Sequence, residues 1–362
     1  METKIFSSPG RFIVGDNEIE SLGKHLDYFG KKALLVAHDD DVQRVRGALE
    51  KSKNSGMSYV KTSFRGECSD LEIQRICSIS ANNEIEIVVG LGGGKAIDTA
   101  KCVSNHLKLP LTVVPTIASC DAPCSSLAVI YTEEHVKEKV YVFSKNPDLV
   151  IVDSRVIANS PSRFLAAGIG DAYATYFEAR ACIESRANNY VGGQSTITAF
   201  EISKICRDVL LRDGKSAMEA CKAKAVTPAL ENIIEANLLL SGIGFESVGL
   251  AVAHAIYNAM TILPEVHPFM HGEIVAFGVL VQHVLEKDSH KQIKETLNFY
   301  KDIGLPTSLS EIGLSKNVDK QLYKVSEAIF THGPSINNLG YTLTPTMVFD
   351  ALKKVNFLKH FY

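Results

Sequence analysis

The sequence predicts an N-terminal α/β domain with a parallel sheet over residues 1–160, followed by an all-α C-terminal domain over residues 161–362. Three observations support this prediction. A chain of 362 residues is long for a single hydrophobic core. Strand-like apolar runs alternate with helical segments up to about Pro161, which is typical of parallel α/β domains. Beyond Pro161 the periodicity is helical and strand-like alternation is almost absent.

The elements of the first domain follow from short apolar runs that end in turn residues. In chain order, we expect strands at 32–37, 59–64, 87–89, 111–115 and 149–152, a helix over 70–81, and a hairpin made of 127–131 and 140–143. The strand at 111–115 leads into TIASCDAPCSS, a segment of small and hydroxylated residues. Such a composition is typical of a segment whose backbone and short side chains face a ligand.

The second domain is predicted from helical periodicity alone. We expect its main helices at 164–182, 195–211, 228–241, 249–261 and 274–286. Together with the α/β half, this gives two domains whose boundary lies near residue 160.

The stretch EIVVGLGGGKAIDTAK, residues 86–101, organises the first domain. A strand that breaks into glycines and resumes as a helix exposes backbone N–H groups, and a phosphate can approach them closely. The spacing is not GxGxxG, whose third glycine would fall on Lys95, nor a P-loop, because Ala96 follows that lysine. We interpret the stretch as a pyrophosphate cradle, and a turn that binds nothing is the alternative.

The strand at 32–37 ends in an acidic tip, His38-Asp39-Asp40-Asp41. A carboxylate at the tip of an early strand in a nucleotide-binding fold often accepts hydrogen bonds from the adenosine ribose. The alternative is a solvated acidic turn that caps the next helix.

Composition excludes several classes of protein. A net charge of −3, a pI of about 6.4 and the lack of a basic run argue against nucleic acid or an anionic membrane as a partner. The N-terminus has no signal-peptide pattern, and no apolar run reaches the roughly 18 residues of a membrane span, so we expect a cytoplasmic protein. The eight scattered cysteines include no CxxC pair, and we expect buried or inert thiols rather than disulfides or a thiolate zinc site.

The helical half contains a second group of candidate functional residues. Asp171 lies in GIGDAYA, His254 in GLAVAHAIYNA, and His267 and His271 are four residues apart in HPFMH. A lone histidine on an apolar helix is more often a hydrogen-bonded core residue than a ligand. Several histidines with a buried-looking acid favour a metal site, and imidazole with carboxylate suits zinc or iron(II). Spacing alone leaves open which two of the three histidines are ligands.

Five motifs resemble one known family: GGGKAIDTAK, PTIASCDAPCSSLAVIYT, GIGDA, GFESVGLAVAHAIYN and HGEIVAFG. They closely resemble the glycerol dehydrogenase branch of the iron-containing alcohol dehydrogenase-like superfamily, in order and over nearly the whole chain. The resemblance implies a Rossmann-like NAD-binding domain and a helical metal domain, together a dehydroquinate synthase-like fold. It also implies NAD-dependent oxidation of glycerol to dihydroxyacetone at a zinc ion between the domains, in a homo-oligomer, an octamer in this family.

The same resemblance assigns residues to these roles. The metal ligands would be Asp171, His254 and His271, which with the substrate-contacting Asp121 would form the catalytic and substrate-binding set. His267 would lie outside the ligands. The residues expected at the cofactor are Gly94, Lys95, Asp98, Thr116, Ser119, Ser125, Leu127 and Tyr131. The acid expected at the strand tip aligns with His38 or Asp39, and we take Asp39 as the ribose contact.

The metal follows from a further comparison within the superfamily. Iron-dependent relatives carry a histidine four residues after the first aspartate ligand, where this chain has Thr175, and three ligands favour zinc with a position open for substrate. Zinc lowers the pKa of bound water to about 7, and a bound alcohol should gain a similar effect.

Two other functions remain as alternatives. A relative acting on a phosphorylated substrate, such as glycerol 1-phosphate, would need extra Lys, Arg or Asn side chains, and residues 116–131 are poor in them. A catalytically inactive nucleotide-binding protein would be expected to have lost a metal ligand, whereas Asp171, His254 and His271 are all present.

Overall fold

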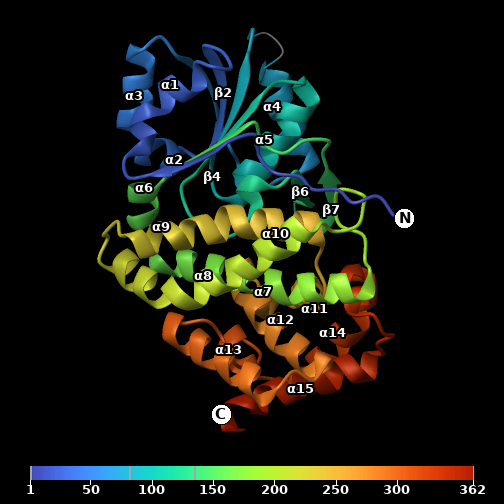
Figure 1. The fold of residues 1–362 in the computed structure, drawn as a ribbon. Coiled ribbons are helices and arrows are strands. Elements are labelled where there is room, and N and C mark those ends of the chain that lie inside the picture. Colours follow the sequence, from blue (N-terminus) through green and yellow to red (C-terminus); the bar gives the residue numbers. More distant parts are fainter. Residues whose placement is uncertain (1, 81–82, 134–135, 362) are drawn as a thin grey trace.

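The computed structural model describes residues 2–80, 83–133 and 136–361. In Figure 1 the α/β half, blue to teal, lies above the helical half, green to red. Six parallel strands form the sheet in the order β1-β8-β5-β4-β2-β3. Their bounds are β1 Phe12–Gly15, β2 Lys32–Ala37, β3 Ser58–Ser63, β4 Ile87–Gly92, β5 Leu111–Pro115 and β8 Leu149–Asp153. The predicted fold class is confirmed.

Strand β4 lies inside the sheet, between β2 and β5, and all of its residues are buried. Its register pairs Leu91 with Ala37 of β2, and Gly92 with Pro115 of β5. Because the strands are parallel, their carboxyl ends lie at one edge of the sheet. The acidic tip after β2, the glycines after β4 and the small-residue segment after β5 therefore lie at the same edge.

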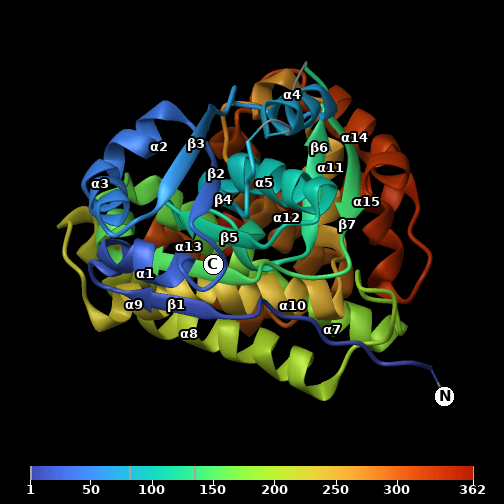
Figure 2. The same ribbon diagram turned by 90° about the horizontal axis from the view of Figure 1, so that it is seen from above.

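Helices cover both faces of the sheet, as Figure 2 shows from above. Alternate strand residues belong to different cores: Leu34 and Val88 join the cluster that includes Ile97 of α5, whereas Leu35 and Val89 join a smaller cluster below α1 and α3. The helices of this half are α1 Leu22–Leu26, α2 Asp39–Arg44, α3 Arg46–Asn54, α4 Asp70–Ser80 and α5 Gly94–Leu107. The predicted end of α4, Ala81, lies outside the described residues.

Three strands differ from the prediction. Strand β4 continues to Gly92, three residues past its predicted end. Strand β1 was not predicted, because its four residues follow Pro9 and Gly10 closely and give too short a pattern. The hairpin of β6 (Leu127–Tyr131) and β7 (Lys137–Val142) is antiparallel, as expected, but β7 begins three residues earlier than the apolar pattern indicated, in alternating charged residues. An exposed edge strand tolerates such residues because one side faces water.

Helices make up the chain after β8, as predicted. They are α6 Ser154–Ala158, α7 Ser162–Ser185, α8 Ile197–Lys222, α9 Pro228–Glu235, α10 Ser241–Val248, α11 Val252–Met260, α12 His271–Glu286, α13 His290–Ile303, α14 Val318–His332 and α15 Pro345–Phe361. A π-helical turn, Ala236–Leu240, joins α9 to α10. Single-turn helices lie at Glu18–Ser21, Ala122–Cys124, Pro264–Val266, Leu309–Ile312 and Pro334–Leu339. Helix α8 continues eleven residues past the predicted end.

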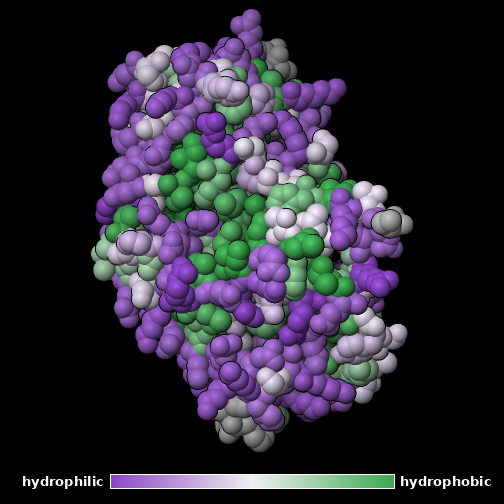
Figure 3. Space-filling model, viewed as in Figure 1, coloured by the Kyte–Doolittle hydropathy of each residue, from purple (hydrophilic) through white to green (hydrophobic). Residues whose placement is uncertain are grey.

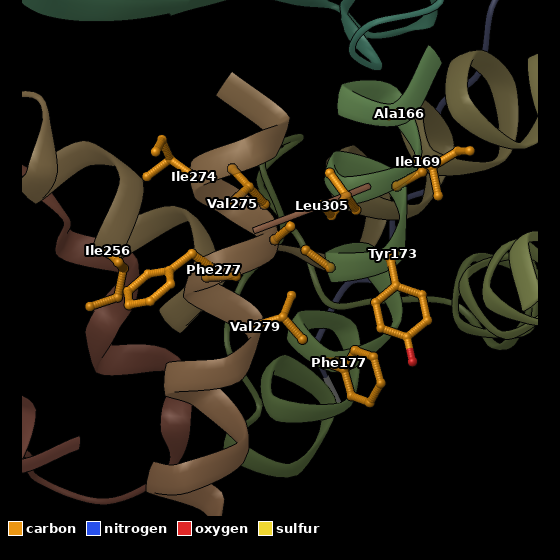
Figure 4. Close-up of a cluster of buried hydrophobic side chains, with 14 of the residues drawn as sticks. Ala166, Ile169, Tyr173, Phe177, Ile256, Ile274, Val275, Phe277, Val279 and Leu305 are labelled. Carbon is orange, nitrogen blue, oxygen red and sulfur yellow. The ribbon is translucent and has the colours of Figure 1, made fainter. Parts of the chain in front are cut away.

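The centre of the helical half is the contact between α7 and α12. Figure 4 labels Ile169 and Tyr173 of α7 and Val275 and Val279 of α12 in one hydrophobic cluster, and all four side chains are buried. The backbones approach closely because Gly272 has no side chain. A Cβ there would lie 1.8 Å from the Ala167 carbonyl oxygen. This close approach sets the first residue of α12 beside the middle of α7.

One hydrophobic cluster includes both sheet residues such as Val88 and helix residues such as Phe277. The domain boundary near residue 160 therefore stays a prediction, with the last sheet strand ending at Asp153. Figure 3 shows a hydrophobic area across the middle of one face, between hydrophilic ends. Among the described helices none alone is long and apolar enough to cross a membrane, although the bent pair Pro228–Val248 and Val252–Met260 reaches that length and composition.

Candidate metal and cofactor site

Three helices bring an aspartate and two histidines together. Asp171 lies in the middle of α7, His254 near the start of α11, and His271 is the first residue of α12. Asp171 Oδ1 lies 3.2 Å from His254 Nε2 and 3.1 Å from His271 Nε2. Within the described ranges this is the one group of three such side chains whose ligand atoms lie within 4.8 Å of one another.

The charges of this group favour a cation at its centre. Burial alone would raise the pKa of Asp171, but His271 and His254 hold it well below the ordinary value of an aspartate. Burial likewise opposes protonation of His254, yet Glu178 and Asp171 raise its pKa to about 10. One carboxylate oxygen and two imidazole nitrogens around a common point form a donor set that suits a divalent metal such as zinc or iron.

Glu178 orients His254. Its Oε2 lies 2.6 Å from His254 Nδ1, and its Oε1 accepts hydrogen bonds from the backbone N–H groups of Ala251, at 2.8 Å, and His254, at 2.9 Å. The carboxylate is fully buried. Because the ring donates Nδ1–H to Glu178, its Nε2 is directed to Asp171 and to any ion beside it.

His267 lies outside the group. Its Nε2 is 2.8 Å from the Thr261 carbonyl oxygen, and the residue is exposed. The ring of His271 instead packs edge-on against Tyr257, with 4.2 Å between ring centroids. Sequence spacing could not choose among three histidines. The structure separates His267 from the other two, His254 and His271.

Asp121 connects the α/β half to this group. Its backbone N–H donates to Asp171 Oδ2 at 3.3 Å, and its own Oδ2 accepts from the Ser241 hydroxyl at 2.7 Å. Burial, followed by the nearby charge of Asp171, raises the pKa of Asp121 well above its ordinary value. The segment that carries Asp121 also packs closely on α7, and this packing requires Gly168. A Cβ there would lie 1.9 Å from the Ala118 carbonyl oxygen.

The glycine stretch forms the N-terminus of α5. Strand β4 ends at Gly92, Gly93 is the N-cap, and no side chain caps this 14-residue helix. Its first N–H groups are therefore available to an anion. A Cβ on Gly93 would lie 3.1 Å from Ile117 Cδ1, and one on Gly94 would lie 3.0 Å from Cys120 Sγ. The donors and the lack of side chains fit a dinucleotide pyrophosphate.

The predicted cofactor residues divide into two sets. Lys95 and Tyr131 lie together, with 5.1 Å from Lys95 Nζ to the ring centroid, and Lys95 also pairs with Glu67 at 2.7 Å. Thr116 directly follows β5, and half-buried Ser119 lies three residues later in the same segment. Gly94 and Lys95 are the first two residues of α5, and the Thr116 backbone N–H donates to the Gly92 carbonyl oxygen at 3.1 Å.

The remaining three, Asp98, Ser125 and Leu127, surround the buried ammonium of Lys101. Lys101 Nζ lies 3.1 Å from Asp98 Oδ1 and 3.3 Å from Ser125 Oγ, and it also donates to the Leu127 carbonyl oxygen. The other Asp98 oxygen accepts from the backbone N–H of Val129 at 3.0 Å, and burial raises the pKa of Asp98. In this structure the three residues hold the segment after β5 in place.

At the acidic tip the structure separates two carboxylates, and the assignment of Asp39 as the ribose contact stays a prediction. Asp39 is exposed and bonds to Ser63 Oγ and Lys61 Nζ, each at 2.8 Å, whereas Asp41 accepts from Thr116 Oγ1 at 2.7 Å. Helix α2 begins at Asp39, and two residues of a helix that are two positions apart point in nearly opposite directions. Asp41 is therefore the carboxylate beside the glycine stretch.

Comparison with known proteins identifies the family. The model of the iron-containing alcohol dehydrogenase family matches residues 9–154. A glycerol dehydrogenase from Thermotoga maritima is 45% identical over 351 residues, covering 97% of this chain and 96% of the relative. This chain belongs to the iron-containing alcohol dehydrogenase family. A glycerol dehydrogenase from Citrobacter freundii is 43% identical over 98% of both chains. The crystal structure of glycerol dehydrogenase from Schizosaccharomyces pombe is 35% identical, covers 99% of this chain and 92% of that chain, and has a TM-score of 0.95.

Sequence reasoning about this family member missed Glu178, Lys101 and Ser241 as parts of the site. Glu178 follows Asp171 by seven residues, two helical turns, so both lie on one face of α7. That spacing was a usable signal for Glu178. Lys101 and Ser241 carried no comparable signal, because their partners are distant in sequence.

Proposed function

We propose that this member of the iron-containing alcohol dehydrogenase family oxidises glycerol to dihydroxyacetone, with NAD as cofactor and zinc as metal. The observation that supports this best is the convergence of Asp171, His254 and His271 beside the buried Asp121. The relatives that are named glycerol dehydrogenases match over nearly the full chain, which supports the same substrate for this protein.

The residues present fit the metal and its chemistry. Asp171, His254 and His271 would hold zinc, and three protein ligands with one open position are typical of a catalytic zinc. Zinc bound there would lower the pKa of an alcohol hydroxyl, and NAD would accept the hydride from the carbinol carbon. The side chain of His271 is 33% exposed whereas that of Asp171 is fully buried, so a substrate would approach from the His271 side.

The chain's own groups orient the reactants. The N-terminus of α5 would bind the pyrophosphate, and Lys95 and Tyr131 lie beside it. Asp121 would accept a hydrogen bond from a glycerol hydroxyl other than the reacting one. Asp41 beside the glycine stretch would disfavour a 2′-phosphate by charge repulsion, so we propose NAD rather than NADP.

The arrangement of domains and subunits extends the proposal. Residues 1–160 would bind NAD and residues 161–362 would bind the metal and substrate, in a cytoplasmic homo-octamer. Light scattering of the purified protein tests the octamer, and a monomer in solution would contradict it.

A substrate test separates this function from its superfamily alternative. Protein stripped with a chelator and reloaded with zinc is incubated with NAD and either glycerol or glycerol 1-phosphate, and NADH is followed by absorbance. We expect turnover with glycerol only, and loss of turnover on stripping. Turnover with glycerol 1-phosphate and none with glycerol would contradict the proposal.

A further inference from the structure

A line of two hydroxyls leads from α7 to Asp121. Ser241 is the first residue of α10, and its Oγ lies 2.9 Å from Thr175 Oγ1 of α7. The same Oγ lies 2.7 Å from Asp121 Oδ2. Thr175 and Ser241 are fully buried, and Asp121 is 9% exposed. A buried hydroxyl pair of this kind has no solvent to exchange partners with, so its hydrogen bonds persist.

The direction of these hydrogen bonds follows from the ionised form of Asp121. A serine hydroxyl has one proton, and the carboxylate oxygen of Asp121 accepts it. Ser241 Oγ must therefore accept the second hydrogen bond, and Thr175 Oγ1–H is its donor. The line runs Thr175 to Ser241 to Asp121, and its last step is a charge-assisted bond when Asp121 is ionised.

Only one of the two Asp121 oxygens is used in this way. Among the residues that the structure describes, none forms a hydrogen bond with Asp121 Oδ1. The residue is also fixed at its backbone, whose N–H donates to Asp171 Oδ2. A buried carboxylate with one anchored oxygen and one available oxygen is suited to accept a hydrogen bond from a ligand next to Asp171.

Close packing keeps the line in place. A Cβ on Gly244 of α10 would lie 2.5 Å from Thr175 Cγ2, and one on Gly242 would lie 3.1 Å from the Asp121 carbonyl oxygen. Helix α10 thus touches both ends of the line.

We propose that Thr175 and Ser241 are positioning residues that hold Asp121 as the acceptor for a second substrate hydroxyl, and that they make the site select polyols over mono-alcohols. This inference rests on the proposed function. It extends that function because it assigns polyol selectivity to two residues that touch neither substrate nor cofactor.

The test compares glycerol with 2-propanol, which has the same secondary carbinol but no further hydroxyl. In the zinc-loaded enzyme, Ser241→Ala should lower kcat/KM for glycerol about tenfold, chiefly through KM, the effect of one hydrogen bond to a charged group. Thr175→Val should lower it by a smaller factor, about threefold. Thr175→Ser, which keeps the hydroxyl, should have the wild-type kcat/KM for glycerol. The kcat/KM for 2-propanol should stay within about twofold.

The double variant tests the order of the line. Because Thr175 acts through Ser241, the double variant Thr175→Val, Ser241→Ala should be no worse than Ser241→Ala alone. Ser203→Ala is the matched control: its hydroxyl is also fully buried and near Gly244, but it bonds to the Ala199 carbonyl oxygen. Its glycerol selectivity should equal that of wild type.

Two results would overturn the inference. Equal losses of kcat/KM on glycerol and 2-propanol in Ser241→Ala would show that Ser241 is a packing residue only. If the fold losses of the two single variants multiply fully in the double variant, Thr175 does not act through Ser241. Zinc content and NAD affinity are measured for each variant, and both should be unchanged. A wild-type enzyme without glycerol turnover would instead refute the proposed function, so the two failures are distinguishable.

Discussion

The metal group and the glycine stretch are two regions of one site, and they are built in different ways. The metal group depends on side chains from three helices that are up to 100 residues apart, and buried partners such as Glu178 orient them. The glycine stretch depends on backbone N–H groups of one contiguous strand, turn and helix. We therefore expect the metal group to be sensitive to loss of a functional group, and the glycine stretch to be sensitive to added bulk.

The largest effect is expected from loss of a metal ligand. His271→Ala should remove zinc and glycerol oxidation together, because two remaining ligands hold a catalytic zinc poorly. His267→Ala, four residues away, should keep most of the zinc and the activity, since its ring bonds to the Thr261 carbonyl oxygen. Metal analysis of both purified variants checks this, and zinc loss in His267→Ala alone would reverse the assignment.

Glu178→Gln tests whether orientation matters as much as ligation. The amide can still accept from the backbone, but its NH₂ would face His254 Nδ1 and require the opposite tautomer, so zinc affinity should fall about 10- to 100-fold. The matched control is Glu246→Gln, another fully buried glutamate, which accepts from the Ser126 backbone and the Asn146 side chain rather than from a metal-ligand candidate. Chelator competition measures both affinities, and equal values would make Glu178 a structural residue only.

An intermediate effect is expected at Asp121, where the two regions meet. Asp121→Asn keeps volume and turn-forming capacity but loses a charged acceptor, which should cost about 1.5–3 kcal/mol, or ten- to a hundred-fold in kcat/KM for glycerol. The penalty should shrink for a mono-alcohol, while NAD affinity and Tm should hardly change. Wild-type glycerol kinetics in this variant would leave Asp121 a turn residue.

The smallest effect is expected at the glycine stretch. Gly93→Val adds a branched side chain at the N-cap of α5, against Ile117, and should raise the KM for NAD severalfold with little change in zinc content. Gly47→Val is the control, because a Cβ at Gly47 meets nothing within 4 Å. An unchanged KM for NAD in the Gly93 variant would show that the cofactor binds elsewhere.

The two regions also differ in how far the sequence predicted them. The glycine stretch was predicted in detail, since strand, turn and helix signals lie next to one another in the chain. For the metal group, residue types and spacing indicated a site but left three histidines open, and only the family resemblance selected His254 and His271. The packing of α7 against α12 separates His271 from His267, and local sequence does not encode that contact.

The residues that were missed share a physical cause. Glu178, Ser241 and Lys101 are polar side chains in buried helices, and each bonds to partners 20 or more residues away in the chain. A pattern of hydrophobicity predicts that a helix is buried but not which polar partner satisfies a buried group. At the acidic tip, which carboxylate lies beside the glycine stretch depends on the residue at which α2 begins, which is the least predictable property of a helix.

Anomalous diffraction tests the central claim most directly. A crystal of the zinc-loaded protein, with NAD and glycerol, is measured above and below the zinc absorption edge. We expect one strong peak at coordination distance from an Asp171 carboxylate oxygen, His254 Nε2 and His271 Nε2, with zinc–nitrogen distances of about 2.0–2.1 Å. A peak at His267, or none beside Asp171, would contradict the proposed metal site and the function that rests on it.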